Sequence, residues 1–163
     1  MSMIIDGTNG LTFNNSTTQA SAGVVLQVVN ANLKGGVSTT LATPVATGLT
    51  ATITPKFATS KILVCFQVNG IQKGPGSVNG GVRIWLYKNG SNLYAGTAQD
   101  YIGYTNSSST NDVGGISMEI FDSPATTSAT TYAIYYGSSD AGIGANVNGG
   151  NDYSTITLME VAQ

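Results

Sequence analysis

The stretch Val82-Arg-Ile-Trp-Leu-Tyr-Lys88 runs into Asn89-Gly90-Ser91 and then into a second β-prone run at 92–97, and it carries the clearest local structural signal in the chain. Asn-Gly tolerates the positive φ angles of a type I′ turn, whose twist matches that of an antiparallel hairpin. The sequence therefore predicts a hairpin of two strands, 81–88 and 92–97. No window of the chain carries apolar residues at helical spacing, so we expect an almost helix-free protein.

Outward from this hairpin, short β-branched or aromatic runs alternate with clusters of Gly, Asn, Ser and Asp, which is typical of a β-sandwich or barrel. The expected strands are 23–30, 50–55, 61–69, 81–88, 92–97, 115–121, 130–137 and 154–161, with one more within 36–47. Proline cannot donate to a β-ladder, so Pro55 and Pro124 should each end the strand before them. We predict an all-β fold, an antiparallel β-sandwich.

The N-terminal segment differs from the rest of the chain. Between Gly7 and Gly23 its large apolar side chains are those of Leu11 and Phe13 alone. Too little apolar area is available there to offset the entropy of ordering the segment. We therefore predict two parts, an extended N-terminal arm over 1–22 and a β-sandwich domain over 23–163. The arm is either flexible or ordered by docking on a partner.

Composition excludes several classes of function. Of the 163 residues, 9% are charged, against about 25% in an ordinary soluble domain. The net charge is −2 and the six cations are scattered, whereas nucleic-acid binding needs cations that converge on phosphates. The apolar runs are strand-sized, far below the ~20 residues that span a bilayer, and the N-terminus lacks a signal-peptide pattern. We expect no nucleic-acid partner, no membrane insertion and no export by that route.

Catalytic and metal sites are not indicated either. The chain has no histidine, which excludes Ser-His-Asp and Cys-His catalysis and imidazole-bound zinc. Cys65 is the single cysteine, and we interpret it as a small buried hydrophobe. Asp122 precedes Ser-Pro and is interpreted as a turn residue. The acids show neither EF-hand spacing nor a distinct pair for glycoside hydrolysis. We expect a protein that is not an enzyme and has no catalytic, cofactor-binding or metal-binding residues.

Two expected strands carry apolar side chains on both faces. In 82–87, one face carries Val82, Ile84 and Leu86, and the other face carries Trp85 and Tyr87. In 132–136, one face carries Tyr132, Ile134 and Tyr136, and the other face carries Tyr135. A sandwich sheet normally leaves one face polar. Either long loops cover these aromatics, or their tips reach water, or they form a subunit interface, where Tyr and Trp are enriched. The candidates for such an interface are Trp85, Tyr87, Tyr132, Tyr135 and Tyr136.

Several stretches resemble a known family. Gly10-Leu-Thr-Phe-Asn-Asn-Ser-Thr-Thr-Gln-Ala-Ser-Ala22 is similar, at Leu11, Phe13, Thr17 or Thr18 and Gln19, to a short attachment segment of tailed-bacteriophage fibre and appendage proteins. Asn14-Asn15-Ser16 stands where that segment commonly has Pro-Asp-Gly. From Val24 onward the chain resembles a small β-sandwich domain of phage structural proteins. The matching pieces are 45–55, 59–64, 122–132 and 154–161, in the expected order.

The resemblance implies a jelly-roll-like homotrimeric knob without known catalysis, carried on the outer surface of the virion and attached to a capsid or tail component. The arm residues Leu11, Phe13 and Gln19 would make the attachment. The expected function is capsid decoration or cementing, or a short head fibre. The alternative is a small tail fibre or receptor-binding knob that contacts host surface glycans, through Tyr101, Tyr104 and the Asn/Ser-rich loop 105–114. Fold alone does not choose between them.

Overall fold

The computed structural model describes residues 4–6, 10–12, 18–19, 24–75, 80–95, 102–105 and 108–163. These residues form strands and a single 3₁₀ turn, η1 (Gly149–Asn151), and they include no α-helix. Within them no helix is long and apolar enough to cross a membrane. The short strands β1 (Ile4–Asp6), β2 (Gly10–Thr12) and β3 (Thr18–Gln19) make a small antiparallel sheet of their own.

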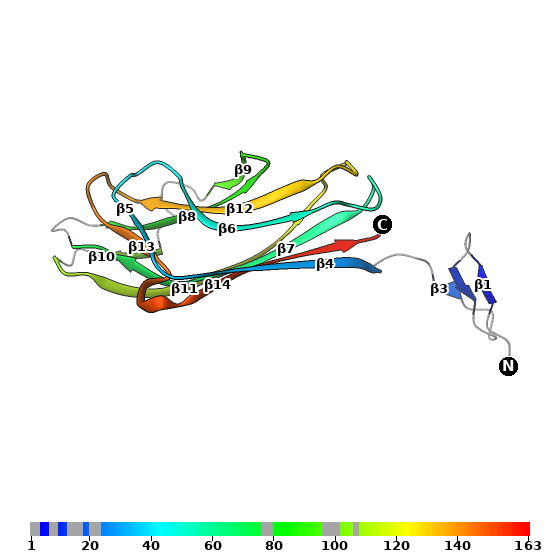
Figure 1. The fold of residues 1–163 in the computed structure, drawn as a ribbon, viewed down its shortest axis with the longest axis horizontal. Coiled ribbons are helices and arrows are strands. Elements are labelled where there is room, and N and C mark those ends of the chain that lie inside the picture. Colours follow the sequence, from blue (N-terminus) through cyan, green and yellow to red (C-terminus); the bar gives the residue numbers. More distant parts are fainter. Residues whose placement is uncertain are drawn as a thin grey trace.

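The rest of the described chain is an elongated sandwich of two antiparallel sheets (Figure 1). The sheet that we call the β8 sheet has the order β10-β8-β12-β6, with β9 also paired to β8. Its strands are β6 (Val45–Ile53), β8 (Gly80–Lys88), β9 (Ser91–Ala95), β10 (Ile102–Thr105) and β12 (Thr130–Ser138). The predicted all-β antiparallel sandwich is confirmed.

The second layer, the β7 sheet, has the order β4-β14-β7-β13-β5, with β11 paired along the other edge of β7. Its strands are β4 (Val25–Lys34), β5 (Val37–Thr39), β7 (Lys61–Lys73), β11 (Asn111–Asp122), β13 (Ala145–Val147) and β14 (Tyr153–Val161). Strand β14 lies between β4 and β7, so residues near both ends of the sandwich sequence pair with each other.

The predicted hairpin turn and the predicted strand ends at two prolines are confirmed. Strands β8 and β9 are joined through Asn89 and Gly90, whose φ angles of 48° and 78° are those of the expected hairpin turn. Strand β6 ends before Pro55, and β11 ends before Pro124. Strands β10 and β13 were not expected, because both lie in segments rich in glycine and polar residues.

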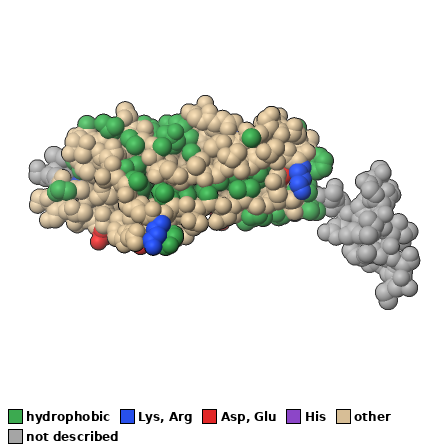
Figure 2. Space-filling model, in the orientation of Figure 1, with side chains coloured by type: hydrophobic (Ala, Val, Ile, Leu, Met, Phe, Trp, Pro, Cys, Tyr) green, Lys and Arg blue, Asp and Glu red, His purple; other side chains and the backbone are tan. Residues whose placement is uncertain are grey.

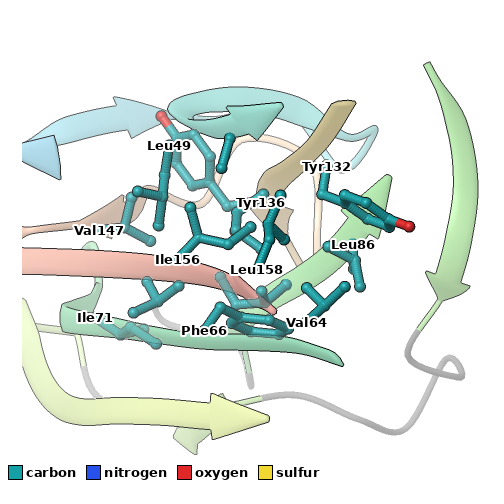
Figure 3. Packing of buried hydrophobic residues seen from close by; sticks show 14 of the residues in the cluster. Leu49, Val64, Phe66, Ile71, Leu86, Tyr132, Tyr136, Val147, Ile156 and Leu158 are labelled. Carbon is teal, nitrogen blue, oxygen red and sulfur yellow. The ribbon is translucent and has the colours of Figure 1, made fainter. Parts of the chain in front are cut away.

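The core lies between the inner faces of the two sheets (Figure 3). The β8 sheet contributes alternate residues of β6, β8 and β12, and the β7 sheet contributes alternate residues of β7 and β14. The largest fully buried members are Leu49, Ile53, Ile62, Ile71, Leu86, Tyr132, Ile134, Tyr136, Ile156 and Leu158. Each such aliphatic side chain stabilises the fold by about 1.5–3 kcal/mol. Because successive side chains of a strand point to opposite faces, the residues between these core positions lie on the outer faces of the two sheets.

Cys65 is an exception to the expected core. It lies on the outer face of the β7 sheet, opposite Glu119 of β11 and Thr157 of β14, and is partly exposed. The prediction of a buried cysteine was wrong because its neighbours Val64 and Phe66, not Cys65, point inward. In a run that is apolar at every position, hydrophobicity alone does not tell which alternate residues face the core.

One end of the sandwich follows the arm directly in sequence. Here β4 begins, β14 ends at Val161 opposite Val25 and Lys61, and β11 ends at Asp122 opposite Ile62. We call this the arm-proximal end. The opposite end, where β7 meets β13, is the distal end.

Candidate functional site

The predicted attachment residues lie in the small N-terminal sheet or outside the described residues. Leu11 in β2 is in register with Ile5 of β1 and Gln19 of β3. Phe13 lies outside the described residues. The arm thus contains local strand pairing that its composition did not predict. The attachment role of these residues remains a prediction.

Of the five aromatics expected at a subunit interface, Tyr132 and Tyr136 belong to the core of a single chain. Their side chains point between the sheets (Figure 3). They are 0% and 1% exposed. They therefore offer no surface to a second copy, and the interface prediction is corrected for these two. The physical reason is that both lie on the inner face of β12, which the sequence left undistinguished from the outer one.

Trp85 lies on the outer face of the β8 sheet but is also largely covered by its own chain, with 6% exposure. The ring lies against Gly137 of β12: a Cβ added at Gly137 would be 3.1 Å from Trp85 Cη2 and 3.0 Å from the carbonyl oxygen of Thr43. Glycine leaves the space that the indole occupies. For Trp85, the alternative in which neighbouring segments cover the second-face aromatic fits better than an interface.

Tyr87 and Tyr135 remain on the outer face of the β8 sheet. Their rings are stacked, with centroids 4.0 Å apart and an interplanar angle of 24°, and both are half-buried. The pair satisfies much of its own contact area within one chain. Tyr104, proposed for glycan contact, belongs to β10, while Tyr101 lies outside the described residues, so neither prediction is tested.

A polar cluster joins the two sheets at the arm-proximal end. Asp122 of β11 accepts hydrogen bonds from Lys88 Nζ at 2.9 Å on each carboxylate oxygen and from Tyr132 Oη at 2.7 Å. Burial, reinforced by the Asp122 carboxylate, strongly raises the pKa of Tyr132. Asp122 is therefore a buried partner in a cross-sheet ion pair and not the turn residue that the sequence suggested. Its role is structural.

Glu160 is the second buried carboxylate at this end. Its Oε1 accepts the backbone N–H groups of Lys56 at 2.7 Å and Phe57 at 3.3 Å, and its Oε2 accepts Gln27 Nε2 at 2.6 Å. Burial alone would raise the pKa of this carboxyl, but the donated hydrogen bonds outweigh that effect and lower the pKa below its ordinary value of 4.5. Glu160 therefore anchors the β6–β7 loop to β14 and β4.

A polar hollow lies toward the distal end on the β7 sheet. Its volume is about 570 Å³, and it is lined by five glycines, the amides Asn69 and Gln72, the carboxylates Asp112 and Asp152, and Ile71. Such side chains offer both donors and acceptors to a hydroxyl-rich ligand. Among the described residues no group of three or more His, Cys, Asp or Glu could hold a metal ion.

An apolar row that was not predicted from the sequence crosses the outer face of the β7 sheet. Val28 of β4, Met159 of β14, Leu63 of β7 and Phe121 of β11 are successive register partners. A signal was available in the sequence, because Ile62-Leu63-Val64 is apolar on both faces, as 82–87 is. The strand pairing that aligns the four residues could not be deduced without the fold.

Comparisons with known proteins give no assignment. No family model matches the sequence, and no curated protein matches it. Among solved structures the chain is similar to one chain of "Structure of infectious bursal disease virus Gx strain", with a TM-score of 0.41 and 13% sequence identity. The similarity covers 90% of this chain and 40% of that one. It carries no argument about function.

Proposed function

We propose that this chain is a non-enzymatic structural subunit of a bacteriophage virion, displayed on the outer surface as a homotrimer. Its role would be capsid decoration or cementing, or that of a short head fibre. The sandwich is the presented part and the arm is the attachment element. The resemblance of 10–22 and of four pieces of the body to phage appendage proteins supports the origin.

One structural observation supports this division of labour. Strands β1, β2 and β3 pair with one another, and none of them is a member of either sandwich sheet. The two sheets complete their core from residues of β6, β7, β8, β12, β13 and β14. A segment that the body does not need for its own core is available to bind another protein and to gain order there.

Deletion of residues 1–22 tests the proposal. The truncated chain should keep a cooperative thermal transition, because its core is intact, but it should no longer load onto virions. Phe13→Ala should weaken loading by ~1–3 kcal/mol, the scale of an anchor side chain, while Ser16→Ala serves as a control in the same segment. Loading at wild-type occupancy by the truncated chain would contradict the attachment role. Copy number per virion then separates decoration, with hundreds of copies, from a tail fibre with a few.

The polar hollow favours a second candidate function, contact with host surface glycans. It lies toward the distal end of the sandwich, and a subunit attached through its arm would leave this end accessible to a receptor. Carboxylates and amides such as those of Asp152 and Gln72 can form hydrogen bonds with sugar hydroxyls. Glycan-array binding that is lost in Asp152→Ala and in Gln72→Ala, with Asp140→Ala as an exposed control, would support this function. Absence of any binding at millimolar glycan would exclude it.

A further inference from the structure

The apolar row crosses the whole width of the β7 sheet at its arm-proximal half. Val28 and Phe121, which stand at its two ends on the edge strands, are 56% and 57% exposed. Met159 and Leu63, between them, are partly exposed. Four strands spaced about 4.8 Å apart make this row about 14 Å long. No charged residue interrupts it.

Exposed apolar side chains gather at the same end of the molecule. Seven large hydrophobic residues are the most exposed in the described part of the chain, and five of them lie here: Val24, Val25, Val28, Phe57 and Phe121. A hollow of about 350 Å³ adjoins them, lined by Val24, Leu26, Phe57 and Ala162 together with three polar residues. Figure 2 shows the hydrophobic side chains at this end. Contiguous exposed apolar surface of this kind marks an association site.

We propose that this surface, the row and the adjoining hollow, is where a second copy of the same chain binds. The proposal deepens the homotrimer of the proposed function, and rests on it, by assigning the subunit contact to the β7 sheet and not to the aromatic face of the β8 sheet. The aromatic candidates are buried or half-buried within one chain, whereas the two ends of the row, Val28 and Phe121, are more than half exposed.

Two observations favour a second copy over a different protein. First, the row is uncharged and aliphatic or aromatic throughout, which is typical of permanent homo-oligomer interfaces; surfaces for transient partners are more polar. Second, Val24, the residue that follows the arm, lines the hollow, so copies joined here bring their arms together. Strands β1, β2 and β3 have three, three and two residues, too few for a stable isolated sheet, and neighbouring arms would provide the missing contacts.

The test compares the oligomeric state of three full-length proteins by light scattering at micromolar concentration. The wild type should have three times the 16.7 kDa chain mass. The double variant Val28→Thr/Phe121→Thr, which places a β-branched residue suited to an exposed strand position at both sites, should fall to the mass of one chain. The matched control Tyr87→Ser/Tyr135→Ser alters the stacked pair on the other sheet and should keep the wild-type mass. Circular dichroism and the melting transition establish that each variant is folded.

Cys65 provides a second readout that does not depend on mass. It lies two residues from Leu63 on the same face, opposite Glu119 and Thr157, and it is the single cysteine. Its reaction with iodoacetamide should be at least tenfold faster in the Val28→Thr/Phe121→Thr variant than in the wild type. A monomeric wild type, a row variant that stays oligomeric, or equal Cys65 rates would each overturn the assignment. If the Val28→Thr/Phe121→Thr variant stayed oligomeric but no longer loaded onto virions, that result would also count against the attachment role proposed for the arm.

Discussion

The hydroxyl of Tyr132 on the β8 sheet donates a 2.7 Å hydrogen bond to Asp122 on the β7 sheet, across the core of the sandwich. The same carboxylate accepts Lys88 Nζ at 2.9 Å. Tyr132 is completely buried, so its hydroxyl must find its partner inside the protein. This hydrogen bond therefore joins the two layers of the sandwich.

Removing the hydroxyl should destabilise the fold without opening a cavity. Tyr132→Phe keeps the ring but leaves the buried Asp122 with one donor fewer, and hydrogen bonds to charged groups contribute about 1.5–3 kcal/mol. Chemical denaturation should show a loss in that range. Tyr87→Phe, on the half-exposed outer face, should change the free energy of unfolding by less than about 0.5 kcal/mol. Equal losses of unfolding free energy in the two variants would contradict a stabilising role for the Tyr132–Asp122 hydrogen bond.

The same residue should make the protein sensitive to alkali. Folding raises the pKa of Tyr132 above its ordinary value of 10.0, through burial and the adjacent carboxylate. A group with a raised pKa contributes its stability fully below the unfolded-state value and loses it as the pH rises beyond that value. Stability should therefore fall above pH 10, and less steeply in Tyr132→Phe. Denaturation midpoints measured between pH 8 and about 11 check the difference, and parallel curves would contradict it.

Glu160 should account for part of the stability that the protein loses at acid pH. Because its pKa is lowered by folding, its contribution to the free energy of unfolding is present above the ordinary value of 4.5 and is lost as the pH falls through the lower folded-state value. Glu160→Gln replaces a carboxylate that faces three donors, and should cost about 2 kcal/mol at neutral pH. The two proteins should converge in stability at strongly acid pH. Glu119→Gln, on the exposed outer face, is the control and should track the wild type throughout.

Gly137 should be needed for the seating of the tryptophan. An added Cβ would lie 3.1 Å from the ring of Trp85 and 3.0 Å from the Thr43 carbonyl, closer than ordinary van der Waals contact. Gly137→Ala should displace the indole and destabilise the sandwich by about 1–3 kcal/mol. Because Trp85 is the only tryptophan, its fluorescence reports the event directly as a shift of emission to longer wavelength. Unchanged emission in a folded variant would contradict this seating.

Local chemistry made the strands and turns predictable. Asn89-Gly90, Pro55 and Pro124 each restrict the backbone through their own φ angles or a missing donor, so the sequence suffices to place the boundaries they set. Strands β10 and β13 lack such apolar patterning. They exist because a longer neighbour supplies the hydrogen bonds, β8 in one case and β7 in the other.

The surfaces were harder to predict than the strands. Tyr132 and Tyr135 have similar sequence contexts, yet one faces the core and the other faces outward, since alternation fixes opposite faces but does not say which face is inner. The apolar row depends on register between strands far apart in the chain. Leu63 and Phe121 become neighbours only once β7 and β11 pair. Such information is held by the tertiary fold and not by any local stretch.

The central place of β14 has a consequence for biosynthesis. In the β7 sheet this strand fits between β4 and β7, pairing Leu158 with both Val29 and Val64. During synthesis, β4 and β7 leave the ribosome long before β14 does, and until then neither has β14 as its neighbour. The sheet closes only after the residues up to Val161 have left the exit tunnel, and pairings between such distant segments form slowly. We therefore expect the nascent sandwich to depend on chaperones until β14 has emerged, and chains truncated before β14 to be cleared by proteases rather than to accumulate as folded domains.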